Sequence, residues 1–125
     1  MEYKINISDN ERYIVIKVKG EMDPNMAIQY TEESHVIGSR KGIDKYLVDL
    51  TEAMNTMRVF ENYEFAHEKV APNPGINKLA KVAFLVSAND HSHDFIETVM
   101  INSGMQVKLF RRLDLALHYL GVQIP

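Results

Sequence analysis

The chain has 125 residues, of which 46% are hydrophobic and 25% charged, and its formal net charge is −3. This is the composition of one globular domain, spanning 1–125, and its scattered Lys and Arg residues argue against binding to nucleic acid. No apolar run reaches the roughly 20 residues that cross a membrane, Met1–Lys4 opens no signal-peptide pattern, and the absence of cysteine excludes disulfides and thiolate chemistry, so we expect a cytoplasmic protein.

The first half of the chain predicts a β-hairpin, a helix and a buried strand. Apolar and polar residues alternate over Tyr3–Ser8, and after a short turn Arg12–Lys19 follows with Tyr13, Val15, Ile16 and Val18, which indicates an antiparallel hairpin. Asp23-Pro24 predicts a helix start, because Asp accepts from free amides and Pro suits the first helical position. Gly38 predicts the end of that helix. The apolar run Tyr46–Leu50 is typical of a parallel strand that is buried on both faces.

The second half predicts three more helices and two more strands. The segment Met57–Val70 has apolar residues at helical spacing, which we expect to face the core. This stripe comprises Val59, Phe60, Tyr63, Ala66 and Val70. The later elements are a strand over Val82–Val86, a helix over His91–Ser103 with Phe95, Ile96, Val99 and Met100 inward, a strand over Met105–Phe110, and a helix with Leu113, Ala116, Leu117 and Leu120 inward that ends at Gly121.

The order of these elements predicts the fold class. It is β-β-α-β-α-β-α-β-α, and strands that alternate with helices of ten or more residues imply right-handed crossovers. We therefore predict an α/β fold with a single mixed, mostly parallel five-stranded sheet and four helices.

Four stretches of the chain resemble a known group of proteins. They are Val18–Gly20 at the end of the hairpin, the strands Tyr46–Thr51 and Lys81–Val86, and the closing run Ser103–Arg111. In their order and spacing they resemble the SpoIIAA-like family, relatives of the STAS domain of anti-sigma-factor antagonists. The resemblance implies a mixed sheet with helices packed on it, and a role in protein association or ligand sensing.

One departure from the STAS pattern concerns phosphorylation. In STAS antagonists an Asp-Leu-Ser-like start leads into a loop that ends in Asp-Ser, where the serine at a helix N-terminus is phosphorylated. Asp49-Leu50-Thr51 matches that start, but Glu52–Arg58 lacks the Asp-Ser pair. Thr56 is the nearest hydroxyl before the predicted helix. Phosphorylation of Thr56 stays open, and we favour a plain helix N-cap.

The carboxyl edge of the predicted sheet is the expected place for a ligand. Ligands of open parallel sheets bind outside the carboxyl ends of the strands, and helix N-termini at that edge favour anions. Four loops are predicted to meet there: Glu21–Asp23, Thr51–Arg58, Ser87–Ser92 and Arg111-Arg112. The candidate ligand-binding or anion-binding residues are polar or basic side chains of these loops: Thr51, Thr56, Arg58, Asn89, Arg111 and Arg112.

Arg112 is the most suggestive of these residues. It falls at the expected N-cap of the last helix, where a cation opposes the helix dipole. A carboxylate such as Glu52 or a bound anion would resolve that conflict. A solvated arginine is the alternative, and we favour it.

The polar cluster Ser87–Asp94 raises the question of a metal site. His91 and His93 are two residues apart, so on a helix their side chains diverge by about 200° and do not readily share one ion. We expect Asn89 or Asp90 to act as an N-cap and the two histidines to be solvated. The sequence therefore predicts no metal and no cofactor.

Catalytic signatures are missing from the sequence. It has no Gly-rich phosphate loop, no Gly-x-Ser-x-Gly and no His-Glu-x-x-His. His67 with Glu64 and Glu68 is interpreted as a solvated pairing on the second helix. We therefore predict that the protein is not an enzyme, although a carboxylate pair assembled only in the fold stays open.

Two functional hypotheses remain. The first is a non-enzymatic protein-interaction or regulatory module that binds a partner protein or itself, a homodimer included, through Met54, Met57 and Phe60. It predicts an exposed apolar patch rimmed by Glu52, Arg58 and Glu61, although adaptable Met side chains also suit plain core packing, which we favour for the two methionines. The alternative is a binder of a small acidic or lipid-like ligand, which predicts a closed pocket of a few hundred Å³ at the carboxyl edge.

Overall fold

The computed structural model describes residues 2–122. Its strands are β1 (Glu2–Ile7), β2 (Ile14–Glu21), β3 (Lys45–Met54), β4 (Lys81–Leu85) and β5 (Gln106–Phe110). Its helices are α1 (Pro24–Lys41), α2 (Val59–Glu64), the π-helix η1 (Phe65–Val70), α3 (Asp94–Asn102) and α4 (Leu113–Leu120).

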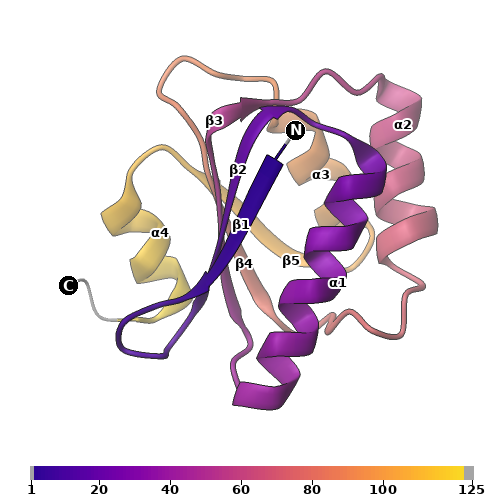
Figure 1. Ribbon diagram of the computed structural model, residues 1–125. Helices are drawn as coiled ribbons and strands as arrows, with labels where there is room; N and C mark the ends of the chain where they lie inside the picture. The colour runs from indigo at the N-terminus through magenta and orange to yellow at the C-terminus, as the bar shows by residue number, and fades with distance from the viewer. Residues whose placement is uncertain (1, 123–125) are drawn as a thin grey trace.

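The strands form one five-stranded sheet in the order β1-β2-β3-β4-β5, so their order across the sheet is their order along the chain. β1 pairs antiparallel with β2, and every other neighbouring pair is parallel. Figure 1 shows α1, α2 and α3 on one face of the sheet and α4 alone on the other. The predicted α/β fold with a mixed, mostly parallel sheet is confirmed.

Each face of the sheet has its own hydrophobic core. On the larger face, β2 contributes Ile14, Ile16 and Val18 at alternate positions, as a strand with one buried face requires. On the other face, Leu47 of β3 packs with Leu117 of α4 and its neighbours. Consecutive residues of β3 are therefore buried, which explains the apolar run that lacks alternation.

The first helix is longer than predicted. α1 continues to Lys41 and ends at Gly42, whose φ of 69° is left-handed. Gly38 lies inside the helix, where Tyr46 of β3 passes so closely that a Cβ on Gly38 would lie 2.1 Å from the tyrosine oxygen. The predicted end at Gly38 is wrong, because this glycine serves close packing rather than a left-handed turn.

The third strand is also longer than predicted. A register shift between Lys17 and Lys19 lets β2 and β3 resume pairing beyond it, with Gly20 opposite Ala53. Thr51–Met54 is therefore strand rather than loop. The backbone hydrogen bonds of a neighbouring strand stabilise this extension, whereas its mixed polar sequence predicts a loop.

The second helical segment differs from its predicted geometry. Val59 and Phe60 are each 68% exposed, whereas Phe65, Ala66 and Val70 are buried. The segment begins as α-helix and continues as π-helix, and a π turn shifts the face that a helix presents. The prediction assumes one uninterrupted 3.6-residue period over Met57–Val70. It therefore places the apolar residues of the first turn in the core, where they do not lie.

Two smaller corrections concern helix starts. α3 begins at Asp94 with His93 as N-cap, later than predicted. Phe95 in its first turn is exposed, and so is Leu113 in the first turn of α4. In α3 the buried stripe consists of Ile96, Val99 and Met100, at the i, i+3, i+4 spacing, and it leaves Phe95 at its border.

Candidate functional site

An open groove of about 670 Å³ lies at the carboxyl ends of β2, β3 and β4. Its lining comprises Gly20, Glu21, Thr51, Glu52, Ala53, Met54, Ser87, Ala88, Asn89 and Asp90. Three of these described residues are acidic and none is Lys or Arg. The groove has the position expected of a ligand site in a parallel sheet, but it is open rather than closed and its charge does not suit an acidic ligand.

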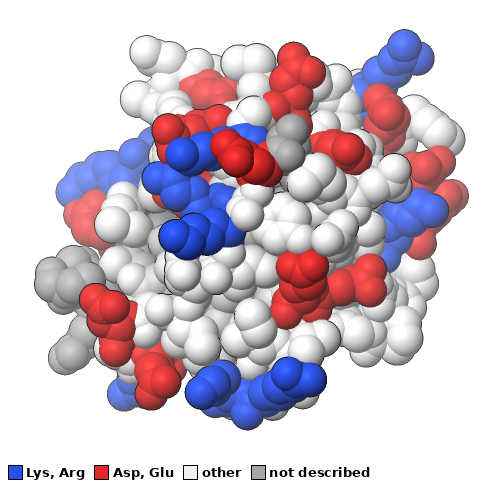
Figure 2. Space-filling view, viewed as in Figure 1, with Lys and Arg blue, Asp and Glu red and all other residues white. Residues whose placement is uncertain are grey.

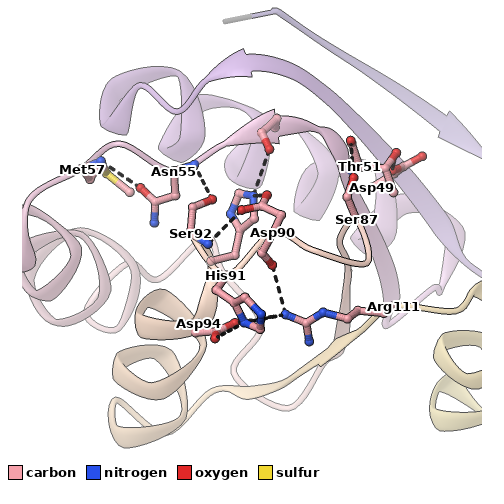
Figure 3. A network of polar contacts seen from close by, with 12 residues as sticks. Asp49, Thr51, Asn55, Met57, Ser87, Asp90, His91, Ser92, Asp94 and Arg111 are labelled. Carbon is pink, nitrogen blue, oxygen red and sulfur yellow. Dashed lines mark hydrogen bonds and ion pairs between the residues drawn. The ribbon is translucent and has the colours of Figure 1, made fainter.

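The floor of the groove is fixed by hydrogen bonds at the end of β3. The Asp49 carboxylate accepts from the Thr51 amide at 3.0 Å and from its hydroxyl at 2.6 Å. The Ser87 hydroxyl donates to the Thr51 carbonyl at 2.8 Å, which joins the ends of β3 and β4 (Figure 3). The polar groups of Thr51 therefore hold the two strand ends together.

Two buried asparagines position the loop between β3 and α2. The Asn55 side chain donates to Asn62 at 2.8 Å and accepts from the Met57 amide at 3.0 Å, while the Asn55 amide donates to the Ser92 hydroxyl at 3.0 Å. Asn62 in turn donates to the Met57 and Arg58 carbonyls at 3.2 and 3.0 Å. Because these amides satisfy one another, the start of α2 has a defined position on the sheet.

His93 lies beneath the groove and is fully buried. Its Nε2 is 3.1 Å from the Ala53 carbonyl and 3.3 Å from an Asp90 carboxylate oxygen. Both partners are acceptors, so Nε2 carries a proton, while Nδ1 has no partner among the described residues. The predicted solvation of His93 is wrong, because the N-cap of α3 turns inward under β3. The neighbouring His91 is exposed as predicted.

Asp90 connects this buried histidine to the loop above it. Burial tends to raise the pKa of Asp90, but hydrogen bonds from Ser92 and the charges of His93 and Arg111 outweigh burial, and its pKa lies below the ordinary value. The carboxylate accepts from the Ser92 amide at 2.8 Å. Asp90 thus folds the loop as an Asx turn, and the predicted N-cap at Asn89 or Asp90 is wrong because His93 takes that position.

Arg111 lies on the outer side of the same loop. Its Nη2 donates to the Asp90 carbonyl at 3.0 Å and lies 3.2 Å from His91 Nδ1 and 3.5 Å from an Asp94 oxygen (Figure 3). These contacts tie the end of β5 to the start of α3. The guanidinium therefore braces the loop and does not line the groove.

Arg112 is the N-cap of α4, as expected. It forms an ion pair at 2.5 Å with Asp114 in the first turn of the same helix. The Arg112 side chain is 68% exposed, as the favoured solvated arginine requires, and Glu52, one carboxylate considered as its partner, pairs with Lys17 at 3.2 Å. The acidic residue of the first turn offsets the unfavourable cation, and no distant carboxylate is required.

Apolar side chains project from the start of α2. The exposed fractions are 68% for Val59, 68% for Phe60 and 50% for Tyr63, and we call these three residues the α2 face. Met57 beside them is half-buried. Met54, at the end of β3, is 55% exposed and lines the groove. The core packing favoured for Met54 is wrong, because Ala53 and Asn55 on either side of it are buried and the alternation along β3 turns the Met54 side chain to the opposite, exposed side.

A serine and a histidine meet on the other side of η1, but not as a nucleophile and its base. His67 Nδ1 is 3.1 Å from the Ser103 hydroxyl, and its ring packs on Tyr63 with centroids 4.2 Å apart. The Ser103 hydroxyl donates to the Val99 carbonyl at 2.7 Å, so Nδ1 must be the donor toward the serine. A nucleophile needs the reverse arrangement. The predicted solvated pairing of His67 with Glu64 and Glu68 is wrong.

Residues 2–122 contain neither a candidate metal centre nor a candidate membrane span. No group of three or more His, Asp or Glu residues there could hold a metal ion. No helix in that part of the chain is long and apolar enough to cross a membrane.

Comparison with known proteins gives likeness in structure but not in sequence. No protein-family model matches the chain, and no curated protein matches it at a significant level. An anti-sigma factor antagonist from Mycobacterium paratuberculosis superposes with a TM-score of 0.57 at 14% identity, over 96% of this chain and 95% of its own. An uncharacterised protein with a SpoIIAA-like fold from Shewanella loihica superposes with a TM-score of 0.53 at 17% identity, over 95% and 92%.

The chain has the SpoIIAA-like fold. In this SpoIIAA-like domain the candidate ligand residues do not gather at one place. Thr51 and Asn89 line the groove, and Thr56 and Arg58 are exposed before α2. Thr56 is not the N-cap of α2, because Arg58 takes that position and its amide donates to Glu61 at 2.9 Å.

Sequence reasoning did not identify the residues that organise the SpoIIAA-like domain at the carboxyl ends of its strands. His93, Asn55 and Asn62 are buried polar side chains in segments that read as loop or solvated helix surface. Their signal is weak, because His93 bonds to the carbonyl of Ala53, 40 residues earlier, and Asn55 and Asn62 bond to each other and to backbone groups of the intervening loop.

Proposed function

We propose that this SpoIIAA-like domain is a non-enzymatic regulatory module of the cytoplasm that binds a partner protein through the α2 face. The observation that carries the proposal is the exposure of Phe60 and Val59, at 68% each, together with Tyr63 one turn further along α2. Contiguous exposed apolar side chains with a charged rim are typical of protein-interaction sites. Arg58 and Glu61 supply part of that rim.

The support beneath the α2 face favours recognition by a surface of fixed shape. Asn55 and Asn62 bond to each other and to the loop, and the Asn55 amide bonds to Ser92 of the next loop. A face positioned in this way loses little conformational entropy when a partner binds. The similar structure from Mycobacterium paratuberculosis is that of an anti-sigma factor antagonist, and we extend action on another protein to this chain as part of the proposal.

That the domain has no enzymatic activity is also part of the proposal. The Ser103 hydroxyl is committed to the Val99 carbonyl. His93 is fully buried and lies beneath the groove rather than in its lining. These arrangements suit structural roles for both residues.

The alternative, a small acidic or lipid-like ligand at the carboxyl edge, has less support. The groove is open, and it carries Glu21, Glu52 and Asp90 without a basic residue in its described lining. Arg111 and Arg112 are occupied by Asp90, Asp94 and Asp114. Native mass spectrometry tests this alternative: a small mass retained by the folded protein and lost on denaturation would favour it.

The partner-binding proposal is tested with Phe60→Glu. Its side chain is mostly exposed, so we expect the free energy of unfolding to change by less than about 0.5 kcal/mol. Affinity capture from cell extract with the wild-type protein identifies the bound protein, and calorimetry with that purified partner measures its Kd. We expect the substitution to raise Kd at least about 30-fold, as loss of a central aromatic residue does.

The matched control is Leu79→Glu. Leu79 is 79% exposed and lies before the start of β4, at the amino ends of the parallel strands, whereas α2 begins beyond their carboxyl ends. This variant should bind the partner as the wild type does. Equal binding by Phe60→Glu and the wild type, or equal loss in both variants, would contradict the proposal.

A further inference from the structure

The two outermost strands of the sheet, β1 and β5, differ in how their outward backbone groups are satisfied. At the β5 edge, the Glu97 carboxylate of α3 accepts a hydrogen bond from the Leu109 amide at 2.5 Å, so this backbone donor is already satisfied. β1 forms the other edge and pairs only with β2 in the described part of the chain (Figure 1). An uncapped edge strand offers its outward backbone groups to another strand.

The phase of the β1–β2 ladder identifies these outward groups. The Ser8 amide donates to the Tyr13 carbonyl at 2.9 Å, which makes this a hydrogen-bonded pair. Bonded and non-bonded pairs alternate along an antiparallel ladder, so Asn6 opposite Val15 and Lys4 opposite Lys17 are bonded too. The backbone groups that face outward belong to the alternate residues: Tyr3, Ile5 and Ile7.

We propose that β1 pairs antiparallel with β1 of a second copy, across a two-fold axis through Ile5. Ile5 then lies opposite the partner's Ile5, and Tyr3 lies opposite the partner's Ile7. Each bonded pair exchanges two hydrogen bonds, so the three pairs make six in all. The two five-stranded sheets join into one. This surface is separate from the α2 face, and the inference does not rest on the proposed function.

The register through Ile5 is selected by the strand itself. A two-fold axis through Lys4 would join only two outward residues, Tyr3 and Ile5, and would place Lys4 opposite the partner's Lys4. The axis through Ile5 uses all three outward residues. It also places Lys4 opposite the uncharged Asn6 of the partner subunit. Like charges directly opposite one another are unfavourable. An axis through Asn6 would join only Ile5 and Ile7, so the axis through Ile5 is favoured by its number of bonded pairs.

The side chains on both faces of β1 fit this arrangement. Tyr3, Ile5 and Ile7 are half-buried against the α1 side, where a second copy would supply aromatic and β-branched neighbours. On the other face, Lys17 and Lys19 are paired with Glu52 at 3.2 and 4.0 Å. Figure 2 shows basic and acidic side chains interspersed on this side of the molecule. A second copy therefore meets no field of a single sign.

The first test is Asn6→Lys, with the oligomeric state of the full chain measured by analytical ultracentrifugation from micromolar to millimolar concentration. We expect the wild type to dimerise. The exposed new lysine lies opposite the partner's Lys4 twice in each dimer and should raise the dimer Kd roughly tenfold. Adding Lys4→Glu to the same chain converts both contacts into opposite-charge pairs and should restore the wild-type Kd. Asn102→Lys, the same substitution on α3, should leave it unchanged.

The second test is Ile5→Pro. Proline removes the outward amide hydrogen at the centre of the interface and leaves the bonds of Lys4 and Asn6 to β2 in place. We expect a monomer whose circular dichroism spectrum is native. If this variant fails to fold, the charge exchange between Asn6 and Lys4 still decides the question.

Three results would overturn the inference. One is a wild-type protein that stays monomeric at millimolar concentration. Binding of an added extended peptide to β1 would not rescue the inference in that case, because the proposed occupant is a second copy of the chain. Another is a dimer whose Kd does not change in Asn6→Lys. The third is a dimer that Phe60→Glu dissolves, because its contact would then lie at the α2 face.

Discussion

Replacing Gly38 with alanine brings two effects of opposite sign into competition. In an ordinary helix interior, Gly→Ala stabilises by about 1 kcal/mol. Here the new Cβ would lie 2.1 Å from the Tyr46 oxygen and 2.6 Å from the Ile43 carbonyl oxygen. Tyr46 is 2% exposed and stacks on His35 with ring centroids 4.4 Å apart, so it has little room to retreat. Overpacking of this kind costs about 3 kcal/mol, and we expect a net loss of about 2 kcal/mol.

Urea unfolding followed by circular dichroism measures this loss. Ser39→Ala, at the neighbouring exposed position, is the matched control and should stabilise by about 0.5 kcal/mol. Combining Gly38→Ala with Tyr46→Phe removes the nearest clashing atom and should recover part of the loss, a coupling that a double-mutant cycle quantifies. If Gly38→Ala were as stable as the wild type, or about 1 kcal/mol more stable, the close approach of Tyr46 would not govern this position.

Two further predictions concern acid stability and backbone strain. Burial, aided by the charge of Lys78, lowers the pKa of His35 to about 4 from an ordinary 6.5, so the unfolded chain takes up this proton first as the pH falls. The free energy of unfolding should therefore fall between pH 6.5 and about 4, by at most about 3 kcal/mol and by less where water reaches the ring. A His35→Gln variant whose free energy of unfolding falls as much over the same range would refute this. Glu11 has a φ of 55° in the hairpin turn, so Glu11→Gly should stabilise by about 1 kcal/mol, and an unchanged melting temperature would contradict the strain.

The features that the sequence predicts well depend on local periodicity and on the exclusion of water. The alternation over Tyr3–Ser8 and the apolar run Tyr46–Leu50 identify a half-buried edge strand and a fully buried central strand. Both assignments hold because the burial of each strand is written in its own residues. The order of elements then restricts the topology, since right-handed crossovers leave few ways to arrange parallel strands.

The features that it predicts poorly depend on contacts between distant segments. Gly38 reads as a helix stop because its reason for being glycine is Tyr46, which comes later in the chain. Thr51–Met54 reads as a loop because β2 supplies its hydrogen bonds. His93 reads as solvated because its acceptor is the carbonyl of Ala53, 40 residues earlier.

The candidate site follows the same division. Sheet topology indicates the correct edge for the groove, because every parallel α/β sheet opens there. The side chains that line it could not be selected from the sequence, since all four predicted arginine and threonine positions outside β3 lie away from it. These four are Thr56, Arg58, Arg111 and Arg112, and each lies outside the described lining.

The strand order of this sheet has a consequence for synthesis on the ribosome. Because each strand neighbours the one before it in the chain, the sheet can grow strand by strand as the polypeptide emerges, without waiting for a distant partner. The second face is different, since Tyr13, Leu47 and Ala83 stay uncovered until α4 has been made. Nascent chains halted before Leu113 should therefore bind an apolar dye that chains halted after Gly121 no longer bind.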